Sequence, residues 1–406
     1  MHDTQLFQQA LGLSYPWCVT RSLFDAEQQR LDVHIDFTAG ARFPCPECGG
    51  PGCPVHDTAE KRWRHLNFFQ HEAYLTARTP RVRCGRCGVR RVAVPWARSG
   101  SGFTLLFEAL VMMLVKDMPV AALARMVAEH DTTLWRIVHH YVDRARAAAD
   151  FSGVRRVGLD EKASKRGHHY LTLFVALERS RLLYATETRE ATTLDAFRRD
   201  LERHGGQATT IEEFCLDMWP AYQKGIADAF PGARMTFDKF HVMKLLNDAV
   251  DKVRRAEQRE RPELKGSRYV WTKNPENLNP HQFALWETLD VKRLNLQTAR
   301  AYHLRLALQE FWTLSATTAE PFLKRWYFWA THSRLDPMIE MARLLRRHWD
   351  GVLRWFQTGI SNGVLEGINS LIQAAKAKAR GYRSTRNLIA MAYLLAGKLD
   401  FKPLPT

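Results

Sequence analysis

Hydrophobic and polar positions follow two different rhythms along the 406 residues, and the changes between them divide the chain. A helical pattern over 3–12 gives way to strand-like alternation around 30–35. A stretch rich in Leu, Ala and Met predicts helix from 104 to about 149. Residues 256–350 are polar, rich in tryptophan and helical in pattern, and predict an all-helical segment.

The block between the two helical stretches alternates short apolar runs with helices. The predicted strands are 155–160, 170–177, 182–186, 211–217 and 234–237, and the predicted helices are 194–203, 220–230 and 239–255. Three strands followed by helix–strand repeats indicate an α/β domain whose sheet has antiparallel and parallel parts. A basic helix over 361–379 follows the all-helical segment.

Composition adds a class of partner to this outline. Lys and Arg number 59 against 43 acids, so the net charge is +16, and such a surface attracts polyanions. A generic basic protein is the alternative. No signal peptide is visible, and the longest apolar run, 103–115, contains Glu108 and is too short to span a bilayer. We therefore expect a cytoplasmic, DNA-associated protein without a membrane segment.

Two Cys-x-x-Cys pairs indicate a structural zinc site. Cys45 and Cys48 form one pair, and Cys84 and Cys87 form the other. Two such turns can close a tetrahedral site with no open position for water. Unliganded buried cysteines are the alternative. The remaining candidates are less favoured: Cys53 and His56 are spare ligands, and Cys18 and Cys215 are expected in the core.

Arginines follow the second half of the cysteine region, and the zinc site could direct them toward DNA phosphates. They are Arg81, Arg83, Arg86, Arg90 and Arg91. Exposed arginines are often merely solvated, so both interpretations stand.

Residues 118–141 fit a helix-turn-helix. A first helix over 118–129 has Pro119 in its first turn, residues 130–133 break it, and a second helix spans 134–141. The second helix would face DNA with Thr133, Arg136 and His140. A plain three-helix bundle is the alternative.

Three acidic residues could converge on divalent metal. Asp160 and Asp217 each end an apolar strand, and Glu366 lies on the C-terminal basic helix. Neighbouring strands can bring the two aspartates together, and a helix across the sheet can add the glutamate. Divalent cations remove the repulsion between such carboxylates, and Mg²⁺ prefers oxygen ligands. We expect two Mg²⁺ ions, with Mn²⁺ as a possible substitute.

The motifs together resemble the ISL3 family of insertion-sequence transposases. The resemblance spans nearly the whole chain. It rests on the cysteine pairs and on the runs Gly158-Leu159-Asp160-Glu161, Asp217-Met218-Trp219-Pro220, Asp238-Lys239-Phe240-His241, Glu366-Gly367-Ile368-Asn369 and Arg380-Gly381-Tyr382-Arg383. It implies an RNase H-like core with an Asp-Asp-Glu triad of Asp160, Asp217 and Glu366, and a helical insertion between the last two.

Two further residues match a signature found before the insertion in related transposases. Asp238 and His241 could support the active site or contact DNA; a helix cap and a packed histidine are the alternative. Glu161 should point to the other face of the sheet than Asp160, so we leave it outside the triad.

A basic run follows the glutamate, and it is expected to hold the DNA backbone. It consists of Lys376, Lys378, Arg380, Arg383 and Arg386. A solvated basic face is the alternative. The tryptophans of the insertion are expected in its core more than on unpaired bases.

The sequence therefore predicts five regions in an α/β fold: a zinc-binding region (1–100), a helix-turn-helix (101–150), the first part of the core (151–255), the insertion (256–350) and the rest of the core (351–406). The expected activity is metal-dependent DNA cleavage and strand transfer at terminal inverted repeats. The expected partners are double-stranded DNA and further copies of the chain in a dimer or larger synaptic complex. A nuclease or resolvase without joining, and a non-catalytic DNA-binding regulator, remain alternatives.

Overall fold

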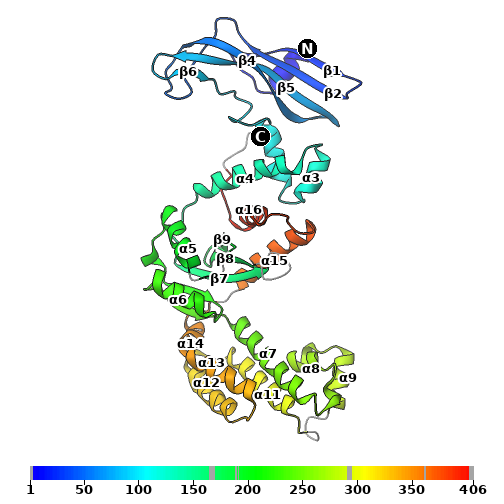
Figure 1. Cartoon of the computed structure of the whole chain (residues 1–406), viewed down its shortest axis with the longest axis vertical. Coiled ribbons are helices and arrows are strands. Elements are labelled where there is room, and N and C mark those ends of the chain that lie inside the picture. Colours follow the sequence, from blue (N-terminus) through cyan, green and yellow to red (C-terminus); the bar gives the residue numbers. More distant parts are fainter. Residues whose placement is uncertain are drawn as a thin grey trace. The chain divides into compact units, whose positions relative to one another are not determined.

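A computed structural model describes residues 3–163, 170–187, 190, 192–289, 295–360 and 363–401. The chain forms two compact units (Figure 1). The first contains Met1–Ala147, Ala375–Arg383 and Leu399–Thr406. The second contains Ala148–Ala374 and Ser384–Lys398. No described helix is both long enough and apolar enough to cross a bilayer.

The first unit begins with helix α1 (Asp3–Ala10) and a six-stranded sheet in the order β1-β2-β5-β4-β3, with β6 on β5. Its strands are β1 (Trp17–Asp25), β2 (Arg30–Phe37), β3 (Arg42–Phe43), β4 (Cys53–Phe68), β5 (His71–Cys84) and β6 (Gly88–Arg91). Alternate residues of β2 and β5 are buried, and Trp17, Trp63 and Trp96 pack edge to face between them and the following segment. The sheet holds the cysteine turns at one end of the long β4–β5 hairpin.

Three helices complete the chain's first 147 residues: α2 (Leu105–Leu114), α3 (Val120–Met126) and α4 (Asp131–Ala147). The continuous pattern over 104–149 is therefore broken twice. Pro119 stands at the N-cap of α3, and Ala128 adopts a left-handed conformation (φ 56°) before α4. Inside the bundle Glu108 is fully buried and accepts hydrogen bonds from Arg98, Ser101 and Tyr141.

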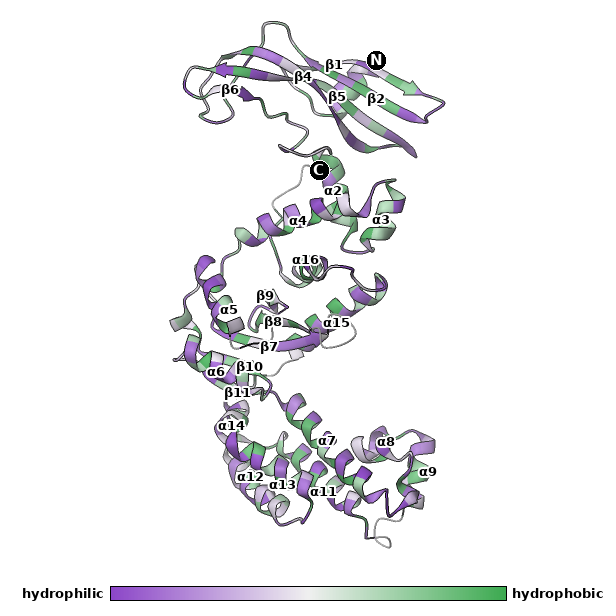
Figure 2. Ribbon diagram, viewed as in Figure 1, coloured by the Kyte–Doolittle hydropathy of each residue, from purple (hydrophilic) through white to green (hydrophobic). Residues whose placement is uncertain are grey.

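The second unit is built on a five-stranded sheet in the order β11-β10-β7-β8-β9. Its strands are β7 (Arg156–Ala163), β8 (Tyr170–Ala176), β9 (Arg181–Thr186), β10 (Glu213–Leu216) and β11 (Arg234–Phe237). The strands β7, β8 and β9 pair antiparallel, whereas β10 lies parallel to both β7 and β11. Hydrophobic residues fill β8 along most of its length (Figure 2). The predicted α/β fold with a mixed sheet is confirmed.

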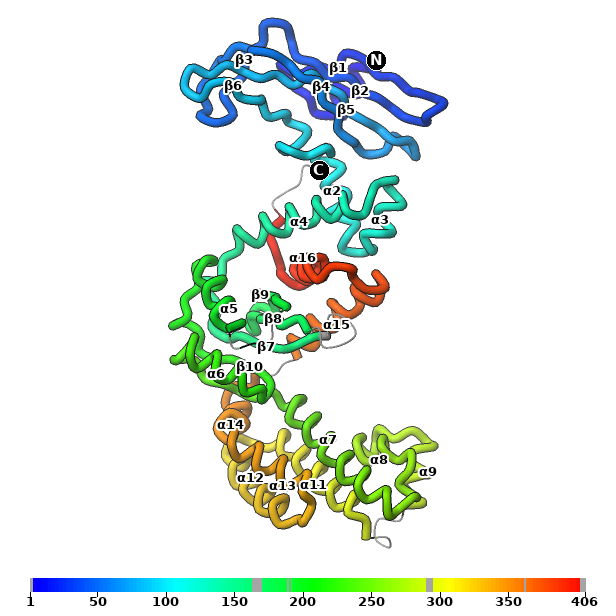
Figure 3. Tube along the Cα trace, in the orientation of Figure 1, coloured from blue at the N-terminus to red at the C-terminus, as the bar shows by residue number. Residues whose placement is uncertain are grey.

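Two helices connect the strands, α5 (Thr192–Arg203) before β10 and α6 (Pro220–Ala229) after it. The chain leaves the sheet after β11 through α7 (Lys239–Glu257) and returns to it through α14 (Trp349–Thr358) (Figure 3). The helices between them are α8 (Arg268–Thr272), α9 (Pro280–Thr288), α11 (Gln297–Phe311), α12 (Ala316–Thr331) and α13 (Asp336–Arg347). The described part of the insertion contains helices and no strand, as the sequence predicts.

Most tryptophans of the insertion are core residues, in agreement with the prediction. Trp271, Trp312, Trp326 and Trp349 are buried, whereas Trp329 is 47% exposed.

The last two helices are α15 (Gly363–Lys378) and α16 (Thr385–Ala396). The helix predicted over 361–379 corresponds to α15, and residues 361–362 lie outside the described residues. The first turns of α15 pack on β7, where Gly158 leaves room for Leu365: a Cβ at Gly158 would overlap the Leu365 side chain. At β9, the Ala185 amide donates a hydrogen bond to the Tyr393 hydroxyl of α16 (3.0 Å).

Candidate active site and zinc site

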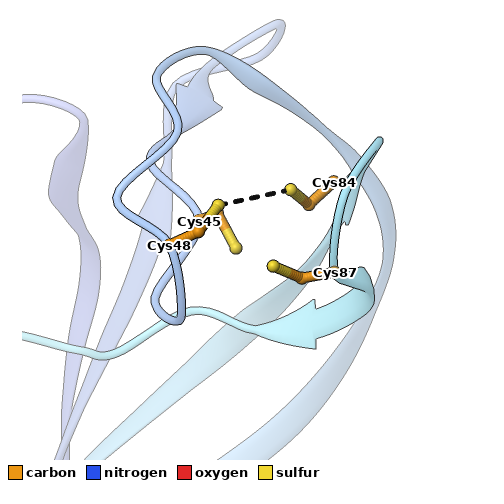
Figure 4. A group of neighbouring side chains, drawn as sticks. All are labelled: Cys45, Cys48, Cys84 and Cys87. Atoms are coloured by element: carbon orange, nitrogen blue, oxygen red, sulfur yellow. Dashed lines mark hydrogen bonds between the residues drawn. The ribbon is translucent and has the colours of Figure 1, made fainter.

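The four cysteines of the two pairs converge on one point. Their sulfurs all lie within 4.8 Å of one another (Figure 4). Cys45 and Cys48 come from the loop between β3 and β4, and Cys84 and Cys87 come from the turn between β5 and β6. Gly49 and Gly88 take left-handed conformations that close these turns. Four sulfurs at this spacing are the donor set of a structural zinc site.

The electrostatics of the turns favour the thiolate at Cys84 and oppose it at Cys87. Backbone hydrogen bonds from Arg86 and Cys87 lower the pKa of Cys84 to about 6. The pKa of Cys87 is raised, chiefly by the hydrogen bond between its thiol and the Cys48 sulfur and then by partial burial. Crowded sulfurs resist sharing negative charge, and a bound divalent cation removes that resistance.

The spare candidates lie outside the four-sulfur group. Cys53 is buried and points its sulfur toward the Gly50 carbonyl (3.7 Å), and His56 bonds to Arg83 (3.0 Å). Cys215 is fully buried, as expected. The core prediction for Cys18 is only partly right, because this residue is half-buried on the edge strand β1.

The arginines near the cysteine turns are all exposed, but several already have partners. Arg81 pairs with Asp57 and Arg90 with Glu47. Arg86 and Arg91 have no carboxylate within 4.0 Å among the described residues. A role in binding phosphates stays a prediction.

Helix α4 has the two faces that a DNA-reading helix needs. Its buried positions are Leu134, Ile137, Val138, Tyr141, Val142 and Ala145. Thr133, Arg136 and His140 share another face, where Arg136 is exposed and the other two are half-buried. The helix is longer than predicted at both ends, because Asp131 already belongs to it and it continues to Ala147. DNA contact by these three side chains stays a prediction.

Three acidic residues stand level at the carboxyl ends of parallel strands. In the pairing of β10 with β7, Cys215 lies opposite Gly158, so two residues further on Asp217 comes level with Asp160. In the pairing with β11, Leu216 lies opposite Phe237, so Asp217 also comes level with Asp238. Parallel neighbours in register point to the same face and stand about 4.8 Å apart. The sequence identifies Asp160, Asp217 and Asp238 as candidates, but it does not predict that the strand register places them side by side.

The position of Asp160 corrects one detail of the prediction. Asp160 does not end its strand, because β7 continues to Ala163 in antiparallel pairing with β8, where Asp160 lies opposite Leu173. It does lie beyond the last residue of β7 paired with β10. Asp217 directly follows β10, as predicted.

A histidine connects two of these carboxylates. His241, in the first turn of α7, places Nδ1 3.1 Å from Asp238 Oδ2 and Nε2 3.8 Å from Asp160 Oδ1. Its pKa is raised, chiefly by the hydrogen bond to Asp238, and burial opposes that rise. Burial raises the pKa of Asp160, while His241, the Glu161 amide and Asn369 act in the opposite direction. Asp238 is the N-cap residue of α7, but its side chain makes no capping hydrogen bond.

Helix α15 reaches the same place from the far end of the chain. Asn369 donates a hydrogen bond from Nδ2 to Asp160 Oδ2 (2.7 Å). Glu366 lies one turn earlier on α15 and is exposed. Among the described residues the four cysteines alone form a group of three or more potential ligands within 4.8 Å, so the carboxyl oxygens of Asp160, Asp217 and Glu366 are not drawn that close together.

Two contacts around the carboxylates were missed by sequence reasoning. The motif containing Asn369 was noted, but nothing in the sequence pairs its amide with Asp160. The Tyr222 hydroxyl of α6 donates to Glu161 Oε1 (2.6 Å). Glu161 thus bonds to α6 while Asp160 bonds to α15, which agrees with their placement on opposite faces of the sheet.

The basic run after Glu366 divides between the two units. Lys376, Lys378, Arg380 and Arg383 lie in the first unit, where Lys378 bonds to the Asp117 carbonyl and Tyr382 packs against the Trp135 ring of α4 at 6.0 Å. Arg386 lies in the second unit. Their contact with DNA stays a prediction.

Comparison with protein families matches three segments in the order of the structural parts. A model described as a transposase matches residues 157–392. A helix-turn-helix domain of transposase family ISL3 matches residues 92–142. The zinc-finger of transposases IS204, IS1001, IS1096 and IS1165 matches residues 41–87, which contain all four cysteines. The predicted helix-turn-helix and zinc ribbon are thereby confirmed.

Whole-chain relatives agree with these segments. The transposase for insertion sequence element IS1557 of Mycobacterium tuberculosis is 31% identical over 98% of this chain and 96% of its own length. The transposase for insertion sequence element IS1001 of Bordetella parapertussis is 28% identical over 87% of this chain and 88% of its own length.

Proposed function

Because the chain belongs to the ISL3 family of DNA-binding transposases, we propose that Asp160, Asp217 and Glu366 form the metal-binding triad with which it cuts and joins DNA. The observation that carries the proposal is the alignment of the strand ends. The register brings Asp217 level with Asp160, and Asn369 of the helix that bears Glu366 bonds to Asp160. Three segments distant in sequence thus meet at one edge of the sheet.

The donor set fits Mg²⁺, which prefers carboxylate oxygens and keeps several waters. Two bound ions would supply the activation of a water or 3′-hydroxyl nucleophile and the stabilisation of the leaving oxygen. Glu366 is exposed on α15, so its side chain is free to turn toward the two aspartates. Mn²⁺ suits the same ligands.

The surrounding residues would orient the triad. Asn369 holds one oxygen of Asp160, and the Glu161 amide donates to the other. His241 bonds to the buried Asp238 and stands beside Asp160, so it restricts the position of that carboxylate from the α7 side. We assign Asn369, Asp238 and His241 as positioning residues.

The other modules would bring DNA to this site. The four cysteines hold a structural Zn²⁺ that fixes the turns of the first sheet, and α4 reads the terminal repeats with Thr133, Arg136 and His140. The basic run beyond Glu366, with Lys376, Lys378, Arg380 and Arg383, holds the DNA backbone. Two ends must be cut together for transposition, so the working form is a dimer or larger synaptic assembly on two DNA ends.

The experiment is cleavage of a duplex carrying the end of the insertion sequence, with Mg²⁺, by wild type and by Asp217→Asn. The variant is expected to bind the duplex as wild type does and to nick it about a hundred- to a thousandfold more slowly, as for the loss of one central electrostatic group. Strand transfer with precleaved ends is measured beside it. Nicking by Asp217→Asn at the wild-type rate shows that the carboxylate is not part of the reaction.

A further inference from the structure

A basic groove lies where the insertion returns to the sheet, and we propose that it binds the phosphate backbone of duplex DNA away from the scissile phosphate. The groove measures about 420 Å³. Its charged lining consists of Arg234, Arg346, Arg347, Arg354 and Asp350, and His348 lies among them. The proposal rests on the proposed function only in taking DNA as the substrate, since it assigns a second DNA contact to the same protein.

The floor of the groove is built by close packing of α14 on β11. Gly351 lies so near the strand that a Cβ would overlap the Phe237 ring and approach the Met235 carbonyl to 3.1 Å. Arg354 donates from Nη1 to the same Met235 carbonyl (3.0 Å). A side chain at position 351 would push the helix away, so a glycine is required for this junction. The groove is therefore a fixed feature of the fold.

The rim of the groove carries positive charge that forms no close ion pair with an acid of the described residues. Arg234, Arg346 and Arg347 are exposed, and among the described residues no carboxylate lies within 4.0 Å of their guanidinium nitrogens. Asp350 is the single acid in the lining. Guanidinium groups present forked donors that match phosphate oxygens. The chemistry thus favours a phosphate ligand.

The rings beside the groove argue for duplex over single-stranded DNA. Trp349 is 8% exposed, and Arg346 covers its ring at 5.0 Å; Phe237 is 4% exposed. Unpaired bases are bound by stacking on open aromatic faces, and none is offered here. Binding through phosphates alone is how proteins hold duplex DNA without reading its sequence.

Arg234, on the rim of the groove, lies at the opposite end of β11 from the carboxylates, although the lining runs along the strand to Phe237. Arg234 begins the strand, whereas Asp238 directly follows it. Four residues of extended chain separate their backbones by about 13 Å. A phosphate held by Arg234 is therefore not the phosphate between the carboxylates. The DNA in the groove is either the inner part of the insertion-sequence end or the target duplex.

The test compares the full-length triple variant Arg234→Gln, Arg346→Gln, Arg347→Gln with wild type. The matched control is Lys252→Gln, Arg259→Gln, Lys265→Gln, which removes three exposed charges of the same chain. Binding of a 40-base-pair duplex of unrelated sequence and of an end-containing duplex is measured without added Mg²⁺ or Mn²⁺ over a KCl series. Log affinity falls linearly with log salt concentration, and each phosphate contact contributes about 0.9 to the steepness of that line. The slope of the groove variant should therefore be shallower than the wild-type slope by about 2 to 3. The slope of the control variant should differ from the wild-type slope by less than about 1.

A groove variant with the wild-type slope on both duplexes, or with no greater loss than the control, overturns the proposal. A larger decrease in slope for the groove variant than for the control, on either duplex, supports the proposal. Nicking and strand-transfer rates then identify which DNA occupies the groove. If the groove holds target DNA, nicking of the end duplex persists while strand transfer falls. If it holds the inner end, nicking falls as well. Because binding is measured without Mg²⁺ or Mn²⁺, the result does not depend on the triad, and failure of the triad appears separately as nicking by Asp217→Asn.

Discussion

Asn369 Nδ2 lies 2.7 Å from Asp160 Oδ2, although the two residues are 209 positions apart in the chain. The hydrogen bond holds one oxygen of the Asp160 carboxylate, and burial raises the pKa of this group. The same bond connects α15 to β7, the central strand of the sheet. Because Glu366 lies on the same helix, the bond also sets the distance from which that acid can reach the aspartates. The account of the active site depends on this helix being held in place.

Replacing Asn369 by Ala should weaken metal use more than DNA binding. Without the amide, the Asp160 carboxylate is free to turn away, and loss of such a supporting contact typically costs ten- to a hundredfold in metal affinity or activity. We expect nicking to need a higher Mg²⁺ concentration, with the maximal rate partly recovered at saturation. Mg²⁺ titration of the nicking rate measures this. An unchanged titration curve would show that the bond does not position Asp160.

Replacing Gly158 by Ala should displace α15. The added Cβ would overlap Leu365 and lie 2.8 Å from Leu177. We expect nicking to fall sharply while duplex binding is kept, and Leu365→Ala in the same chain should restore part of the rate by making room. Gly232→Ala is the control, since a Cβ there meets nothing within 4 Å. Equal activity of the Gly158 and Gly232 variants would contradict the packing argument.

Removing one cysteine of the four should release the metal from the first unit. Wild type is expected to contain one zinc per chain, and Cys84→Ser none, because a three-ligand site binds far more weakly. The variant should melt at a lower temperature, since metal binding contributes to folding. Cys18→Ser is the matched control. Metal analysis by mass spectrometry checks the stoichiometry, and a Cys84→Ser protein that keeps its zinc would exclude this site.

Acid should weaken the first unit through His65. Burial lowers the pKa of this imidazole to about 4 in the folded chain, against 6.5 when unfolded. The unfolded state therefore takes up the proton first, and stability is complete above pH 6.5 and falls as the pH drops toward 4. The loss is at most about 3.5 kcal/mol, at roughly 1.4 kcal/mol for each pKa unit.

Thermal melting between pH 7 and 5 compares wild type with His65→Gln. His65 bonds to Thr104, which caps α2, so the effect should appear in the first unit. The variant should lose less melting temperature over this range, and the difference between the two proteins isolates His65 from the cysteines. Parallel curves would show that the imidazole does not carry the effect.

The sequence predicts which residues and strands form the candidate site, but it does not predict how they are arranged in space. Asp160 and Asp217 stand out because each follows an apolar run, and strands of that type pair side by side. Asp217 lies beside Asp160 because of the register in which β10 pairs with β7, and no local sequence pattern determines that register. The bond from Asn369 depends on how α15 packs after the insertion, so no local pattern reveals it. The sequence does not predict strand β1, because Leu23 and Phe24 are adjacent and both exposed, which breaks the alternation of apolar and polar positions.

Glu366 is the exposed member of the proposed triad, and its role in metal binding gives the most direct test. The measurement is end nicking by Glu366→Cys in Mg²⁺ and in Mn²⁺, with wild type active in both. A thiolate is a poor ligand for Mg²⁺ and a better one for Mn²⁺. The account predicts that the variant is inactive in Mg²⁺ and regains part of its rate in Mn²⁺. Wild-type nicking by Glu366→Cys in Mg²⁺ would contradict a metal-binding role for this residue.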